Sequence, residues 1–170
     1  MGYVGCGNAL MLSKQHEVSI VDIDESKVKN FNNGQLPIHD VFAQQYFENE
    51  DLHLSATVNL NESIQDASFI ILSLPTNFDE TTKQYDTKII EEVVNHIIHE
   101  NIGALIVIKS TVNIGYTKSL SEKLGTKRII FSPEFLREGY ALEDNLFPSR
   151  VIVGGEDEDS KLFGKILCES

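Results

Sequence analysis

Short apolar runs alternate with longer amphipathic segments along most of the chain. The continuous apolar runs at 67–74 and 104–108 are typical of strands buried in a parallel sheet. Four further strands are expected at residues 17–22, 52–57, 128–131 and 151–155. Amphipathic spacing predicts helices at residues 6–15, 24–31, 41–49, 61–66, 86–100, 116–124 and 160–168. Loops are expected at residues 78–85 and 144–150.

Strands that alternate with helices predict an α/β fold with a doubly wound, mostly parallel sheet and helices on both faces. The crossovers between parallel strands should be right-handed. Three aromatic side chains of the 41–49 helix, Phe42, Tyr46 and Phe47, are expected in the core. His53, His96 and His99 are expected at the surface.

The first residues resemble half of a phosphate-binding turn. Gly2-Tyr3-Val4-Gly5 matches the second half of a G-x-G-x-x-G turn, and Asp22 ends a predicted strand 20 positions after Gly2. In dinucleotide folds glycine lets the backbone approach the pyrophosphate, the helix start supplies amide donors, and the acid bonds the ribose hydroxyls. An acid there favours NAD over NADP, because it repels a 2′-phosphate. The alternative for Asp22 is a helix N-cap, a role that Asp24 can also fill.

Polar residues follow four of the predicted strands, at Asp22, 75–77, 109–111 and 132–138. Ligands bind at the carboxyl ends of strands in open α/β sheets, so these loops are expected to converge on one crevice. Thr76 is equally well interpreted as a turn residue, and Lys27 either is solvated or faces a ligand.

The segment Ser132-Pro133-Glu134-Phe135-Leu136-Arg137-Glu138-Gly139 combines two carboxylates and a guanidinium with an apolar pair. Glu134 and Glu138 are four residues apart, so a helical turn would place both on one face. Like charges in such a position repel, which favours a functional site in which one acid stays ionised. The alternative is a solvated helix start with Arg137 in water.

Composition narrows the class of protein. The 170 residues suffice for one well-packed domain, and the formal net charge of −12 argues against a nucleic-acid partner. No apolar run is long enough to span a membrane, and the first residues lack the basic region and apolar core of a signal peptide, so a cytoplasmic protein without a membrane partner is expected. Cys6 and Cys168 have no metal-type spacing, and such sparse cysteine suits a reducing compartment.

Six motifs together are similar to the NAD-binding domain of the UDP-glucose/GDP-mannose dehydrogenase family, over essentially the whole chain. They are Gly2-Tyr3-Val4-Gly5, Val21-Asp22-Ile23-Asp24, Pro75-Thr76-Asn77, Lys109-Ser110-Thr111, Ser132 to Glu138, and Pro148-Ser149-Arg150. The resemblance implies a Rossmann-like fold and oxidation of a sugar 6-hydroxyl to a carboxylate, in two steps that use two NAD and water. UDP-glucose is the expected substrate. The alternatives are GDP-mannose, an N-acetylated UDP-hexosamine, or a non-catalytic remnant.

The same resemblance implies roles for individual residues. Expected NAD contacts are Gly2, Val4, Gly5, Asp22, Lys27, Thr76, Thr111 and Glu138. Expected catalytic residues, which position water or transfer protons, are Thr111, Glu134 and Glu138. The expected lining of the nucleotide-sugar site is Glu134, Phe135, Leu136, Arg137 and Glu138.

The resemblance also implies a single NAD-binding domain over residues 1–170, with the first strand missing and without the central helix and C-terminal domains. The family's nucleophilic cysteine, with its lysine and asparagine partners, lies in those later domains, and Cys168 does not occupy its position. The chain alone is therefore expected to be inactive, with NAD binding weakened or lost, and with exposed sheet edges. The complete enzyme is expected to be a homodimer or larger.

Overall fold

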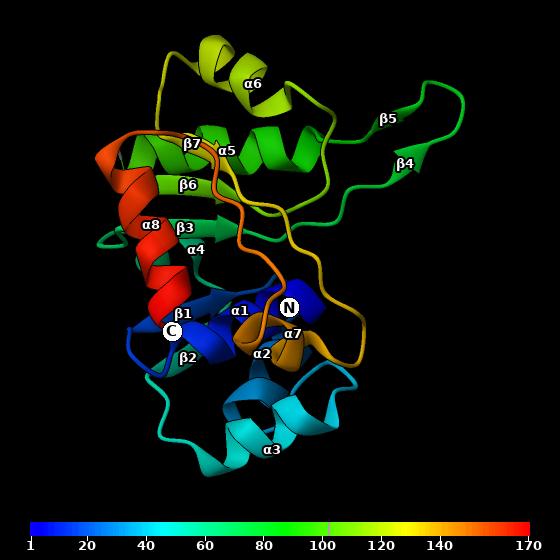
Figure 1. Cartoon of the computed structure of the whole chain (residues 1–170), viewed down its shortest axis with the longest axis vertical. Helices are drawn as coiled ribbons and strands as arrows, with labels where there is room; N and C mark the ends of the chain where they lie inside the picture. Colours follow the sequence, from blue (N-terminus) through cyan, green and yellow to red (C-terminus); the bar gives the residue numbers. More distant parts are fainter. Residues whose placement is uncertain (102) are drawn as a thin grey trace. The chain divides into compact units, whose positions relative to one another are not determined.

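The computed structural model describes residues 1–101 and 103–170, shown in Figure 1. The chain divides into two compact units, each described by itself below. Unit 1 comprises Met1–Ser63, Phe135–Val151 and Lys165–Ser170; unit 2 comprises Ile64–Glu134 and Ile152–Gly164. In the described part of the chain no helix has the length and apolar character needed to cross a membrane.

Unit 1 is built on a pair of parallel strands. Its elements are α1 (Tyr3–Leu12), β1 (Val18–Val21), α2 (Glu25–Asn32), α3 (Val41–Asn49), β2 (Leu54–Thr57) and α7 (Ala141–Leu146). The ladder places Val18 opposite Leu54 and Val21 opposite Thr57. Two more helices, α4 (Leu60–Ile64) and α8 (Glu158–Glu169), have residues in both units.

The core of unit 1 forms where α2 and α3 meet the strands. Phe31 is buried, and its ring centroid lies 4.7 Å from that of Phe47. Val28 and Ala56 complete the buried cluster. The expectation that Phe42 is buried is wrong, because it is 44% exposed. On a 3.6-residue period the inner face of α3 carries Ala43 and Phe47, and Phe42 falls beside it.

Two close contacts fix α7 in unit 1. The buried Asp40 carboxylate accepts hydrogen bonds from Ala43 N (3.0 Å) and from Leu142 N (3.3 Å), so one side chain caps α3 and holds the start of α7. On α1, a Cβ at Gly7 would lie 2.7 Å from Asn145 Nδ2. Gly7 therefore permits the close approach of α1 and α7.

Unit 2 contains a three-stranded parallel sheet in the order β3-β6-β7. Its elements are β3 (Phe69–Leu72), β4 (Phe78–Asp79), β5 (Gln84–Tyr85), α5 (Lys88–Glu100), β6 (Leu105–Ile108), α6 (Tyr116–Leu124) and β7 (Ile129–Phe131). All four residues of the central strand β6 are buried, which confirms the strand predicted from its apolar run. Together, the two parallel sheets and their helices confirm the α/β class.

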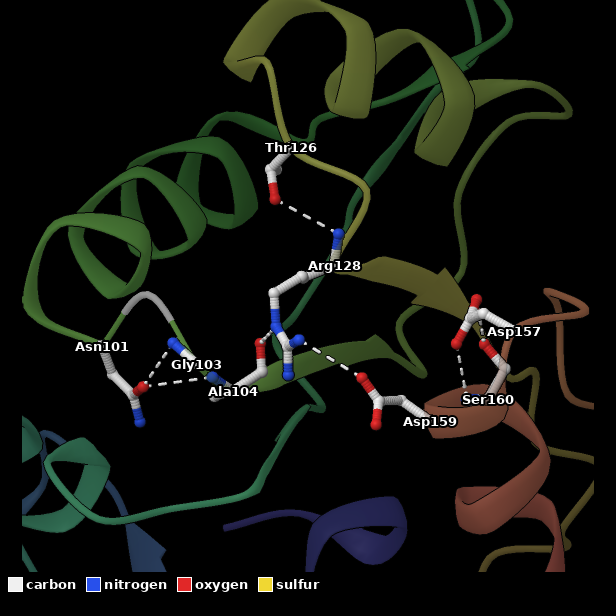
Figure 2. Close-up of polar contacts among 8 residues, drawn as sticks. All are labelled: Asn101, Gly103, Ala104, Thr126, Arg128, Asp157, Asp159 and Ser160. Atoms are coloured by element: carbon white, nitrogen blue, oxygen red, sulfur yellow. Dashed lines mark hydrogen bonds and ion pairs between the residues drawn. The ribbon is translucent and has the colours of Figure 1, made fainter.

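Hydrogen bonds close the amino-terminal end of this sheet, as Figure 2 shows. Arg128, just before β7, donates from Nε to Ala104 O (2.9 Å) and from a terminal nitrogen to Asp159 (3.2 Å). Asn101 Oδ1 accepts from the backbone N–H groups of Gly103 and Ala104 (2.9 and 3.1 Å). The polar groups at this end satisfy one another and tie the strands to neighbouring segments.

Three loop and strand expectations are wrong. Residues 78–85 form the hairpin β4–β5, which projects from the sheet in Figure 1; its turn contains Lys83 at φ 56°. The loop expected at residues 144–150 begins only at Phe147, because residues 141–146 form α7, whose Ala141 and Leu142 are buried. Residues 151–155 form no strand, although Gly154 N donates to Phe131 O at 2.7 Å. The positive φ of Gly155 (101°) takes the backbone out of the extended conformation.

Candidate functional site

Asp22 lies directly after β1, where its N–H continues the ladder to Thr57 O at 3.2 Å. Asp22 Oδ1 accepts from Asp24 N at 2.9 Å, and Oδ2 contacts the α-amino group of Met1. Partial burial raises the pKa of Asp22, but the hydrogen bonds from the amino group and from Asp24 N outweigh it. The pKa of Asp22 therefore lies below its usual range, and the carboxylate is ionised at neutral pH.

Asp24, and not Asp22, caps helix α2. Its carboxylate accepts from Ser26 N (2.9 Å) and Lys27 N (3.2 Å), so the N-cap alternative for Asp22 is wrong. Lys27 is half-buried, and its charge helps to lower the pKa of Asp22. Asp22 is thus an ionised carboxylate at the end of β1, and it does not cap a helix.

The start of α1 lies beside this carboxylate. Gly2 is the N-cap residue and accepts from Cys6 N at 2.9 Å; Tyr3, Val4 and Gly5 form the first turn. An added Cβ at Gly2 would meet no atom within 4 Å, so the backbone is open on that side. The first amides of a helix lack intrahelical partners and suit an anion.

The two thiols differ in their surroundings. Cys6 is buried in α1, and burial raises its pKa to about 11, so it stays protonated and unreactive at neutral pH. Cys168 is exposed on α8. Neither thiol is placed as a nucleophile by its surroundings.

The segment expected to line the sugar site is not helical, so the argument that Glu134 and Glu138 share a helical face is wrong. Pro133 restricts the residue before it to extended conformations, which disfavours a helix start there. Glu138 is exposed and Leu136 is half-buried. The segment follows β7 as a loop that turns at Glu138 and Gly139.

The guanidinium of Arg137 is held by an acid on α7. It donates to Asp144 from Nε (3.1 Å) and from a terminal nitrogen (2.7 Å), and its backbone N–H also bonds Asp144 (2.8 Å). It also lies over the Tyr140 ring at 4.6 Å. The bond to Arg137 lowers the pKa of Asp144. The alternative of a solvated helix start is wrong about the helix, but Arg137 is 65% exposed, as that alternative expects, and its bonds to Asp144 order this loop.

Phe135 is also covered by an arginine. Its ring is 50% exposed, and the Arg150 guanidinium carbon lies 4.4 Å from the ring centroid. Such stacking is typical of cation–π pairs. It connects the two ends of the 135–151 segment of unit 1.

The carboxyl ends of the strands in unit 2 carry the second group of polar residues. Lys109 Nζ lies 3.1 Å from Glu134 Oε2, with the lysine side chain 3% exposed and the glutamate 18% exposed. Thr76 is half-buried after β3, and Thr111 is exposed after β6. The sequence places Lys109 in the polar group at 109–111 but gives it no role of its own, although a lysine directly after an all-apolar strand is the available signal.

The structure thus brings the predicted residues together in two groups. In unit 1, Gly2 to Gly5 lie with Asp22 and Lys27; in unit 2, Glu134 lies with the ends of β6 and β7. Their convergence on a single crevice stays a prediction.

A parallel strand that ends on an ionised acid, beside the glycine-rich start of a helix, defines a dinucleotide-binding domain of the Rossmann class. The chain belongs to the UDP-glucose/GDP-mannose dehydrogenase family, whose NAD binding domain matches residues 1–169. This match assigns NAD as the cofactor.

Two curated relatives of this chain are both named UDP-glucose 6-dehydrogenase. The chain is 41% identical over 172 residues to the UDP-glucose 6-dehydrogenase of Campylobacter jejuni, covering 100% of this chain and 44% of the relative. It is 43% identical over 161 residues to that of Streptococcus pneumoniae, covering 95% and 41%. The chain therefore spans less than half the length of these relatives.

Solved structures agree on the fold. A GDP-mannose dehydrogenase from Pseudomonas aeruginosa, solved as a ternary complex, superimposes with a TM-score of 0.83 at 27% identity, covering 98% of this chain and 42% of that one. A UDP-glucose dehydrogenase from Pyrobaculum islandicum has the same TM-score at 24% identity, covering 99% and 42%.

Proposed function

We propose that this chain is the NAD-binding part of a UDP-glucose 6-dehydrogenase, which oxidises UDP-glucose to UDP-glucuronate with two NAD and water. The observation that carries the proposal is the 41% identity, over the whole chain, to an enzyme of that name. The ionised Asp22 beside the open start of α1 supports the cofactor part of the proposal independently.

In this proposal unit 1 holds the adenosine end of NAD. Asp22 accepts hydrogen bonds from the ribose hydroxyls, and the backbone N–H groups at Val4 and Gly5 donate to the pyrophosphate. The positive charge of Lys27, close to Asp22, adds attraction for the phosphates. When bound, NAD supplies the hydride acceptor. Thr76, Thr111 and Glu138 are proposed as further NAD contacts, from the family resemblance.

The proposed catalytic residues lie after β6 and β7. Glu134 is partly exposed and is proposed to take a proton from the water that attacks the oxidised sugar, with Thr111 helping to place that water. Residues Phe135 to Glu138 are proposed to line the nucleotide-sugar site. Asp144 already holds the Arg137 guanidinium. We therefore propose that the backbone of this segment contributes more to binding the nucleotide sugar than the charge of Arg137 does.

The proposal is tested in a chimera in which this chain replaces the matching residues of the C. jejuni enzyme. We expect NADH formation with UDP-glucose, at about two NADH per sugar, and little with GDP-mannose or UDP-N-acetylglucosamine. Glu134→Gln in the chimera should slow turnover about a hundredfold or more, since a positioned base contributes roughly 10²–10⁴. The matched control Glu91→Gln changes a half-buried acid of α5, paired with Lys123, and should leave turnover intact.

Each contrary outcome has a meaning. A chimera that folds, binds NAD and oxidises none of the three sugars would favour the non-catalytic alternative. A preference for GDP-mannose or the N-acetylated sugar would favour a sister enzyme. Unchanged turnover with Glu134→Gln would remove Glu134 from the acid–base role.

A further inference from the structure

Lys109 is a charged side chain buried at the carboxyl end of the three-stranded sheet. Its ammonium lies 3.1 Å from Glu134 Oε2. We propose that Lys109 is a positioning residue, which holds and orients the Glu134 carboxylate for its action on water. The inference rests on the proposed function, because it gives Lys109 a task in the same reaction.

Backbone hydrogen bonds hold Lys109 itself and Ser132, which lies two residues before Glu134. Lys109 N donates to Leu72 O of β3 at 2.9 Å, and Ser132 N donates to Ile108 O of β6 at 3.0 Å. Ser110 Oγ in turn accepts from Leu74 N at 2.8 Å. The residues that follow β3, β6 and β7 are therefore tied to one another, and the pair lies in loops that begin directly after β6 and β7 and are anchored to the sheet.

The two side chains differ in their access to solvent. The Lys109 side chain is 3% exposed, whereas that of Glu134 is 18% exposed. The ammonium therefore lies on the inner side of the pair, and the carboxylate is the group that a ligand or water can reach. Lys109 thus acts through Glu134 and is not itself placed to contact a substrate.

A purely structural role does not account for the pair well. Removing two charges from water is costly, and buried pairs can often be replaced by apolar residues without loss of stability. The four residues of β6 before Lys109 are all apolar and buried, so an apolar residue would continue that pattern. An ammonium here has the distinct effect of stabilising and orienting a carboxylate anion.

The first test uses the 170-residue chain and does not depend on enzymatic activity. Ammonium groups held by a carboxylate and shielded from water give visible ¹H–¹⁵N signals at low temperature. We expect such a signal for Lys109, and its loss in Glu134→Ala. Lys123 is the matched control, because its pair with Glu91 (2.5 Å) leaves the lysine side chain 63% exposed. Absence of a Lys109 signal in the unmodified chain would overturn the inference.

The second test measures catalysis in the C. jejuni chimera. Lys109→Met should lower kcat about ten- to hundredfold, with a much smaller change in KM, since displacing a catalytic group by about 1 Å can cost 10² in rate. Added methylammonium should restore part of kcat in Lys109→Ala, and the control Lys123→Met should change neither constant. Rescue by the amine is a result that a merely structural role would not give.

These results distinguish the positioning role of Lys109 from the proposed dehydrogenase function. A Lys109→Met chimera with kcat within twofold of the unmodified chimera would overturn the positioning role. If Lys109→Met fails to fold, the amine rescue of Lys109→Ala and the ammonium signal still decide the matter. An unmodified chimera without dehydrogenase activity would count against the proposed function, whereas the signal test would still report on the pair.

Discussion

Asp22→Asn weakens NAD binding by this chain about ten- to hundredfold, because each hydrogen bond to a charged acceptor contributes about 1.5–3 kcal/mol. The carboxylate is ionised at neutral pH and lies at the end of β1. The amide that replaces it accepts through one oxygen only and carries no charge. Isothermal titration with NAD measures the effect directly.

The same variant should narrow the preference for NAD over NADP, since the asparagine no longer repels a 2′-phosphate. Asp24→Asn is the matched control: it removes a charge two residues away but keeps a good N-cap for α2. We expect NAD binding by this control to be close to that of the unmodified chain. Equal dissociation constants for Asp22→Asn and the unmodified chain would rule out the ribose contact.

Asp40→Ala should lower the free energy of unfolding by about 2–4 kcal/mol. Loss of a helix N-cap costs about 0.5–2 kcal/mol, and an unsatisfied buried N–H at Leu142 adds about 1–3 kcal/mol. The cost is large because Asp40 is 3% exposed and water cannot replace its bonds. Urea unfolding followed by circular dichroism gives the difference.

The control for this prediction is Asp24→Ala, which removes the exposed cap of α2 and should destabilise the chain less than Asp40→Ala does, because water can replace its bonds. Asp40→Asn should keep the α3 cap and lose less than Asp40→Ala. If Asp40→Ala were no more costly than Asp24→Ala, the link from α3 to α7 would contribute little to stability.

Local patterns predicted the regular elements well. Helices α3 and α6 were expected with the bounds that the structure has, and β6 follows from five consecutive apolar residues. Two elements differ from these predictions: one depends on partners distant in sequence, and the other consists of two-residue strands around a local turn. Helix α7 is short and is stabilised by α1 and Asp40, and the hairpin β4–β5 depends on a turn around Lys83. Neither the helix nor the hairpin is long enough to give a recognisable periodicity of apolar residues.

The candidate site shows the same division. The motif around Asp22 predicts this acid as the ribose contact. The N-cap of α2 is Asp24, which the capping preference of aspartate also allows. The pairing of Lys109 with Glu134 joins residues 25 apart in sequence, and only strand order brings them together. The clamp between Arg137 and Asp144 was invisible because Asp144 was expected to lie in a loop.

The central claim is that NAD binds at the start of α1 and the end of β1. The most direct measurement is an amide ¹H–¹⁵N spectrum of the chain during titration with NAD and, separately, with NADP. We expect the largest shifts at Gly2 to Gly5 and Asp22, and saturation at a much lower concentration of NAD than of NADP. Shifts confined to other parts of the chain, or none at millimolar NAD, would contradict it.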